Sequence, residues 1–126
     1  MQVNFNGPVW MTQALLPLLK SSDDASVVFT SSGVGRKGRA YWGAYAISKA
    51  ATENFVEVLA DEVAHLGNIR VNSLNPGATR TRMRKSAYPA EDPARLRTPE
   101  KIMPTYLWLM GPDSQGHNGE KLDAQP

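Results

Sequence analysis

Apolar residues recur along the chain with two different spacings. Residues 3–20, 44–66 and 99–110 carry them three and four positions apart, the spacing of one helix face. In residues 44–66 the predicted buried stripe comprises Ile47, Ala51, Phe55, Val58, Leu59, Val63 and Leu66. Pro17 is expected to kink the end of the first helix, and Gly67 is expected to end the second.

Three shorter runs have the composition of β-strands. Residues 25–31 suit a strand buried on both faces, residues 69–75 alternate until a Pro-Gly pair ends them, and residues 120–123 form a last short run. Helices and strands therefore alternate, which predicts an α/β fold built on a parallel sheet with crossover helices. The glycine-rich residues 33–43 are predicted to form a loop, and residues 78–98 are rich in Arg, Lys and Pro.

The composition narrows the classes of function. The chain has 126 residues, enough for one domain but few for a complete α/β enzyme with its own cofactor site. A net charge of +2 does not argue for a nucleic-acid partner, and the absence of cysteine excludes disulfides and thiolate metal sites. His65 and His117 lie far apart, so no metal site is expected. Without a long apolar run or the zones of a signal peptide, we expect no membrane contact and a cytoplasmic location.

Tyr45 and Lys49 are the first candidates for chemistry. They are four residues apart at the start of a predicted helix, so both side chains lie on the same face. A phenol is a weak acid and base at neutral pH, but a neighbouring ammonium and the helix N-terminus both favour its phenolate form. The pair can therefore move a proton to or from a carbonyl or hydroxyl oxygen. The same spacing also occurs where a tyrosine simply packs and a lysine is solvated.

Polar residues follow each of the first two predicted strands. Ser32 comes just after the first strand, 13 residues before Tyr45, and its hydroxyl can hold a substrate oxygen beside the phenol. Thr79 and Thr81 follow the Pro-Gly turn after the second strand. Because α/β folds bind ligands at the carboxyl ends of their strands, we expect these groups to lie close together. In the alternative interpretation they are ordinary strand ends, whose hydroxyls satisfy backbone groups.

These motifs together resemble the short-chain dehydrogenase/reductase family. Ser32, then Tyr45-Ala-Ile-Ser-Lys49, then the Pro-Gly-x-x-x-Thr run that ends at Thr81 match the family motifs in order. The segment Val3-Asn4-Phe5-Asn6-Gly7 resembles the one that carries the family's catalytic Asn, and the tail from Lys121 to Pro126 resembles that of the YciK-type bacterial subgroup. The resemblance implies the C-terminal part of a Rossmann-like, doubly wound parallel sheet. The N-terminal strands and the Gly-rich cofactor turn are missing, so residues 1–126 are a single partial domain.

The resemblance also implies a role for each motif residue. It makes the protein an NAD(P)-dependent oxidoreductase that acts on a small carbonyl or alcohol substrate, with NADP or NAD as cofactor and NADP favoured by the subgroup. Tyr45 would be the general acid/base, Lys49 would bond the nicotinamide ribose, and Ser32 would orient the substrate oxygen. Asn4 would hold a water that links Lys49 to solvent. The implied cofactor-binding residues are Tyr45, Lys49, Pro76, Gly77, Thr79 and Thr81.

The cofactor turn of that family, Thr-Gly-x-x-x-Gly-x-Gly, does not occur in the sequence. The Gly33-x-Gly35-x-x-Gly38 spacing lies between Ser32 and Tyr45, so it is interpreted as an active-site loop rather than a phosphate site. Without its usual neighbour, the strand at residues 27–31 would expose an edge. The alternative function is therefore a truncated, non-catalytic remnant that only dimerises. The resemblance implies a homodimer or homotetramer, formed through the helices that carry the catalytic Asn and Tyr.

Residues 80–97 carry six basic side chains against Glu91 and Asp92. By resemblance this segment is the substrate lid, and its charge would favour an anionic substrate or the phosphates of the cofactor. A solvated, mobile loop is the plain alternative. Nucleic-acid binding is poorly supported, because Tyr88 is the only aromatic residue interleaved with these charges.

Overall fold

The computed structural model describes residues 1–125 and contains a parallel sheet of three strands in the order β1-β2-β3. The strands are β1 (Ala25–Thr30), β2 (Ile69–Asn75) and β3 (Lys121–Asp123). In β1, Ala25 lies opposite Ile69, and in β3, Lys121 lies opposite Ser73. The α/β fold with a parallel sheet is therefore confirmed. Pro126, the last residue of the tail, lies outside the described residues.

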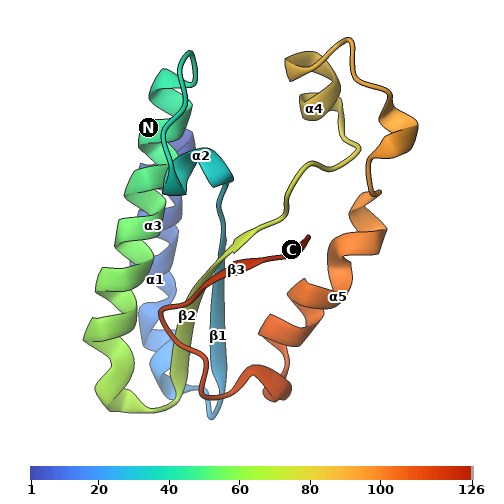
Figure 1. Ribbon diagram of the computed structural model, residues 1–126. Coiled ribbons are helices and arrows are strands. Elements are labelled where there is room, and N and C mark those ends of the chain that lie inside the picture. Colours follow the sequence, from blue (N-terminus) through green and yellow to red (C-terminus); the bar gives the residue numbers. More distant parts are fainter. Residues whose placement is uncertain (126) are drawn as a thin grey trace.

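Helices cover both faces of this sheet (Figure 1). A five-residue π-helical turn (Gln2–Asn6) leads into α1 (Gly7–Ser21), which contains Pro17 and continues beyond it. Helix α3 (Gly43–Val63) ends in a 3-10 turn, and Gly67 then adopts a left-handed φ of 75°, which confirms it as the terminator. Helices α1 and α3 lie on one side of the sheet and α5 (Pro99–Met110) lies on the other.

Two segments predicted as loops contain short helices. The prediction of a loop over residues 33–43 is wrong at its start, because residues Gly33–Arg36 form α2. The basic segment contains α4 (Arg82–Ala87), which Thr81 caps by accepting a hydrogen bond from the backbone N–H of Arg84. Short helices of this kind give weak periodic signals, since four to six residues hold no repeat of the apolar pattern.

The buried face of α3 differs from the predicted stripe. Ile47 is 63% exposed and Val58 is 47% exposed, whereas Glu53 is 3% exposed. Glu53 is buried with partners, because the Arg36 guanidinium (Nε–Oε1 3.1 Å) and the Ser73 hydroxyl (Oγ–Oε2 2.8 Å) both donate to its carboxylate. The buried set is Ser48, Thr52, Glu53, Val56, Leu59, Ala60 and Val63. Satisfied polar groups thus turn the helix away from the orientation that its apolar residues alone predict.

A separate core lies on each face of the sheet. Val56 and Leu59 of α3 pack against strand residues such as Val71 on one face. Leu74 packs with Ile102 and Leu109 of α5 in the other core. Within residues 1–125, no helix combines the length and apolar character needed to cross a membrane.

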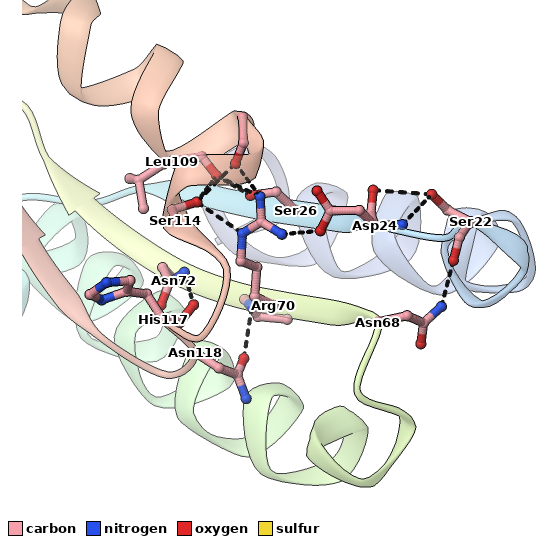
Figure 2. A network of polar contacts seen from close by, with 12 residues as sticks. Ser22, Asp24, Ser26, Asn68, Arg70, Asn72, Leu109, Ser114, His117 and Asn118 are labelled. Atoms are coloured by element: carbon pink, nitrogen blue, oxygen red, sulfur yellow. Dashed lines mark hydrogen bonds and ion pairs between the residues drawn. The ribbon is translucent and has the colours of Figure 1, made fainter.

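A buried arginine joins the start of the sheet to the end of α5 (Figure 2). The Arg70 guanidinium pairs with the Asp24 carboxylate and donates to the Ser114 hydroxyl (Nε–Oγ 2.9 Å) and to the Gly111 carbonyl. Ser114 in turn donates to the carbonyl of Leu109, in the last turn of α5 (2.8 Å). The network therefore satisfies carbonyl groups that the helix end leaves without intrahelical partners.

The outer edge of β1 has no partner strand among residues 1–125, because β1 is the first strand of the sheet and pairs only with β2. A cavity of about 790 Å³ runs along this edge, between α1 and α5. Its lining includes Met11 and Leu15 of α1 and Met110 of α5, all of which are exposed. The predicted free edge of the first strand is thus present, with apolar side chains on both sides of it.

Candidate active site

The carboxyl ends of β1 and β2 open into a second cavity of about 810 Å³. Ser31 and Ser32 directly follow β1, and Pro76 and Gly77 directly follow β2. Further parts of the lining come from the loop between α2 and α3, from the start of α3 and from α4. The location agrees with the general rule that parallel sheets bind ligands at the carboxyl ends of their strands.

Gly35 brings the turn after Ser32 into direct contact with α3. A Cβ atom at position 35 would lie 2.7 Å from the backbone carbonyl carbon of Lys49, a distance that atoms do not reach without a shift of the backbone. Only glycine therefore lets α2 approach α3 this closely. The close approach places Ser32, at the N-terminus of α2, near the first turns of the helix that carries Tyr45 and Lys49.

Tyr45 and Lys49 lie one turn apart on α3, as predicted. The Lys49 ammonium nitrogen is 5.7 Å from the centroid of the Tyr45 ring and donates to the backbone carbonyl of Thr30 (3.1 Å), the last residue of β1. Burial lowers the pKa of Lys49 from its ordinary value of 10.5. The lysine thus links the end of β1 to the candidate acid/base.

Asn4 lies in the π-helical turn before α1, a type of turn that occurs often at functional sites. Its side-chain amide donates to the hydroxyl of Ser48 (Nδ2–Oγ 3.3 Å), the residue before Lys49. Asn4 and Lys49 both line the cavity along the edge of β1. The two residues are therefore close, on the side of the site that faces this edge.

The turn after β2 is fixed by its own backbone and by the tail. Gly77 has a φ of 77°, and its N–H donates to the side-chain oxygen of Asn75 (3.1 Å). The Gln125 amide donates to the carbonyls of Pro76 and Ala78 (2.9 Å each). Thr79 donates its hydroxyl to the carbonyl of Gly77 (3.0 Å). The tail thus positions the predicted cofactor-side turn.

The eight residues singled out from the sequence are divided between the two cavities. The cavity at the strand ends is lined by Ser32, Tyr45, Pro76, Gly77, Thr79 and Thr81. Asn4 and Lys49 line the cavity along β1 instead. The structure therefore gathers six of the eight around one cavity and leaves the other two in the cavity along β1.

Sequence reasoning assigned no role to several side chains that line the strand-end cavity. Lys37, Arg39 and Trp42 come from the loop between α2 and α3, and Tyr88 follows α4. The Trp42 ring is 5.8 Å from the Tyr45 ring and 6.2 Å from the Tyr88 ring, measured between centroids. Helical or strand periodicity does not reveal that these side chains line a cavity. The signal that could have found them is their place in the sequence, between Ser32 and Tyr45 or within the basic segment.

The cavity also holds an unsatisfied polar group. Ser31 is 3% exposed, and within residues 1–125 its hydroxyl oxygen has no hydrogen-bond partner. Buried hydroxyls normally have a partner, so Ser31 is an exception in this part of the structure. Ser31, Thr79 and Thr81 all belong to the lining of the cavity, which therefore includes three hydroxyl-bearing side chains in addition to Ser32.

Comparison with known proteins identifies the fold family. Residues 1–92 match the family described as short chain dehydrogenase. The chain is 62% identical over all 126 residues to the Escherichia coli K12 oxidoreductase YciK, and it covers 49% of that protein. A Shigella flexneri 2a short chain dehydrogenase complexed with NADP is 61% identical, with a TM-score of 0.95 over 99% of this chain and 52% of that chain. An E. coli CFT073 short chain dehydrogenase complexed with NADPH is 62% identical, with a TM-score of 0.95 over 99% of this chain and 51% of that chain.

The chain belongs to the short-chain dehydrogenase family. It is similar to YciK through its tail as well as through its motifs, which confirms both the family and the subgroup resemblance. The chain spans about half the length of these relatives.

Proposed function

We propose that this chain forms the catalytic half of an NAD(P)-dependent oxidoreductase that interconverts a carbonyl compound and an alcohol. The observation that carries the proposal is the group formed by Ser32, Tyr45 and Lys49, with the Lys49 ammonium 5.7 Å from the Tyr45 ring centroid. Ser32 and Tyr45 line the same cavity, which supports a shared role at one substrate oxygen. The NADP and NADPH complexes of two relatives support NADP as the cofactor.

Each of the three residues has a distinct task in this proposal. Tyr45 donates its phenolic proton to the carbonyl oxygen during reduction and accepts a proton from the hydroxyl during oxidation. The positive charge of Lys49 favours the phenolate that remains after donation, and Ser32 holds the substrate oxygen in place. A bound nicotinamide supplies or accepts the hydride.

Other residues of the chain would hold the cofactor and return the proton. Pro76, Gly77, Thr79 and Thr81 line the cavity and would face the nicotinamide, and Tyr45 and Lys49 would bond its ribose hydroxyls. Asn4 would hold a water that passes protons between Lys49 and the cavity along β1. Support for this relay comes from the contact of Asn4 with Ser48, the residue next to Lys49.

We further propose that the protein is a homodimer or homotetramer. The support is the apolar surface on the helix that carries Tyr45, where Ile47 and Val58 are both exposed.

The experiment that tests the proposal uses a completed chain, in which residues 1–126 follow the part of E. coli YciK that precedes the matching half. In this completed chain, Tyr45→Phe should lower kcat for NADPH-dependent carbonyl reduction by about 100-fold or more, because general acid catalysis contributes that much. NADPH affinity, measured by fluorescence titration, should stay within about twofold, since the ring remains in place. Turnover that survives the substitution would refute the acid/base role of Tyr45.

A second candidate function is a non-catalytic remnant that only dimerises, and the unpaired edge of β1 favours it for residues 1–126 taken alone. NADPH titration separates the two candidates. Binding by the purified 126-residue chain would support autonomous function, whereas binding by the completed chain alone would restrict catalysis to a longer protein.

A further inference from the structure

The strand-end cavity carries positive charge that its lining does not balance. Its lining includes Lys37, Arg39 and Arg84 but no aspartate or glutamate. Arg84 is already paired, because its guanidinium donates to both carboxylate oxygens of Glu91 (2.8 and 2.9 Å) and stacks on the Tyr88 ring at 3.7 Å. Lys37 and Arg39 are exposed and make no ion pair within residues 1–125. Two cations are therefore available to a ligand.

The basic lid segment does not supply these free charges. The Arg80 guanidinium donates to the carbonyls of Pro93, Ala94 and Leu96 (2.9, 3.5 and 3.3 Å), so it holds its own loop together. Arg84 is neutralised by Glu91 in the same segment. Of the six basic residues between positions 80 and 97, only Arg84 lines the cavity, so the unpaired cations of the cavity lining lie in the loop between α2 and α3.

The loop that carries the two cations lines the same cavity as Tyr45. The backbone carbonyl of Arg39 accepts a hydrogen bond from the Trp42 N–H (3.3 Å), and the Trp42 ring lies 5.8 Å from the Tyr45 ring. Figure 1 shows this loop at the N-terminal end of α3, across from α4. The loop thus combines positive charge with an aromatic surface next to the candidate acid/base.

We propose that the substrate is a carbonyl or alcohol compound with an apolar, planar body and an anionic group such as a carboxylate. Lys37 and Arg39 hold the anionic group, while Trp42 and Tyr88 contact the body and leave the reacting oxygen at Tyr45. This inference rests on the proposed oxidoreductase function and names its substrate class. An arginine in this loop suits a carboxylate well, because its guanidinium can donate two parallel hydrogen bonds.

The phosphates of the cofactor share the same anionic chemistry, so the test must separate the two sources. The completed chain is assayed with NADPH and two aldehydes of similar shape, 4-formylbenzoate and its neutral methyl ester. We expect a higher kcat/KM for the acid than for the ester. In the double variant Lys37→Gln/Arg39→Gln, the acid-to-ester ratio of kcat/KM should fall about tenfold, as expected for two partly exposed ion pairs. The effect should appear in KM for the acid, with KM for NADPH within about twofold.

A matched control removes the same charge elsewhere. Arg82 and Lys85 are exposed on α4 and do not line the cavity, so Arg82→Gln/Lys85→Gln should leave the acid-to-ester ratio within about twofold. An equal fall in both double variants would overturn the inference, since the effect would then come from net charge. A rise in KM for NADPH with an unchanged ratio would also overturn it and assign the cations to the cofactor.

The inference can fail separately from the proposed function. Suppose that both aldehydes are turned over and that Lys37→Gln/Arg39→Gln leaves the acid-to-ester ratio of kcat/KM unchanged. The proposed substrate class would then be refuted, and the proposed oxidoreductase function would stand. Absence of NADPH oxidation with any carbonyl compound would count against the function. In that case, calorimetric titration of 4-formylbenzoate still decides the inference: roughly tenfold weaker binding by the double variant supports it, and equal binding overturns it.

Discussion

Two opposing effects act on the charged form of Lys49. Its ammonium donates to the carbonyl of Thr30 at 3.1 Å and lies beside the Tyr45 ring, yet partial burial removes much of its hydration. Desolvation penalises the charged form, which is why the pKa of Lys49 is lowered. A lowered pKa suits a residue that is proposed to exchange protons with a relay. Burial of the charged ammonium also lowers the stability of the fold at neutral pH.

This cost gives a prediction for the pH dependence of stability. Because the pKa of Lys49 is lower in the folded chain than its ordinary value of 10.5, the folded chain binds fewer protons between those two values. The free energy of unfolding should therefore gain a rising contribution as pH increases through that window. Lys49→Met should remove this contribution, as measured by urea unfolding of the 126-residue chain at a series of pH values from 7 upward. An unchanged pH slope in the variant would contradict the role assigned to burial.

At the scale of elements, the active site depends on how closely α2 and α3 pack. Gly35 has no positive φ, so its requirement is steric: a side chain at this position would overlap the backbone of Lys49. Arg36, in the same short helix, donates to Glu53 of α3 and to the Asp123 carboxylate of β3 (3.0 Å). Helix α2 therefore ties the Ser32 turn to two neighbouring elements.

Gly35→Ala is expected to lower both stability and kcat/KM more than an alanine substitution usually does. The added Cβ should cost about 1–3 kcal/mol of stability as an overpacking change, and it should lower kcat/KM by moving Ser32 relative to Tyr45. Gly38→Ala is the matched control, because a Cβ at position 38 meets no atom within 4 Å. Urea unfolding and steady-state kinetics of the completed chain compare the two variants. Equal effects at both glycines would show that contact with Lys49 does not limit the packing.

The long elements were predictable from the sequence, and the details of the site were not. The stretches that became α3, β2 and α5 carry enough apolar positions to reveal their period. Lys37 and Arg39 lie in the six-residue connection between α2 and α3 (residues 37–42), which has no period, and only the tertiary fold places them at the cavity. The burial of Glu53 depended on Arg36 and Ser73, which are distant in sequence. Motif order indicated the candidate catalytic residues, and the placement of Tyr45 and Lys49 on one helix face was predictable because their spacing is a local property.

At the scale of the whole molecule, two of the exposed apolar surfaces differ in what they suit. One lines the cavity along the unpaired edge of β1, and it includes Met11 and Met110. The other lies on α3, where Ile47 and Val58 are three helical turns apart and so share one side of the helix. The first surface adjoins free backbone groups and suits further strands of the same sheet. The second has no such groups nearby and suits a helix of another protomer.

The second surface gives a test of assembly. The double substitution Ile47→Glu/Val58→Glu should convert the proposed dimer or tetramer of the completed chain to smaller species, because two buried carboxylates would lack partners in the interface. Met103→Glu/Leu107→Glu is the matched control: it places two glutamates at exposed apolar positions of α5, on the opposite face of the sheet. Sedimentation velocity at several concentrations measures the change. If only the α3 variant dissociates, the interface includes α3. If both variants keep the parent's mass, the apolar side of α3 is not where the protomers meet.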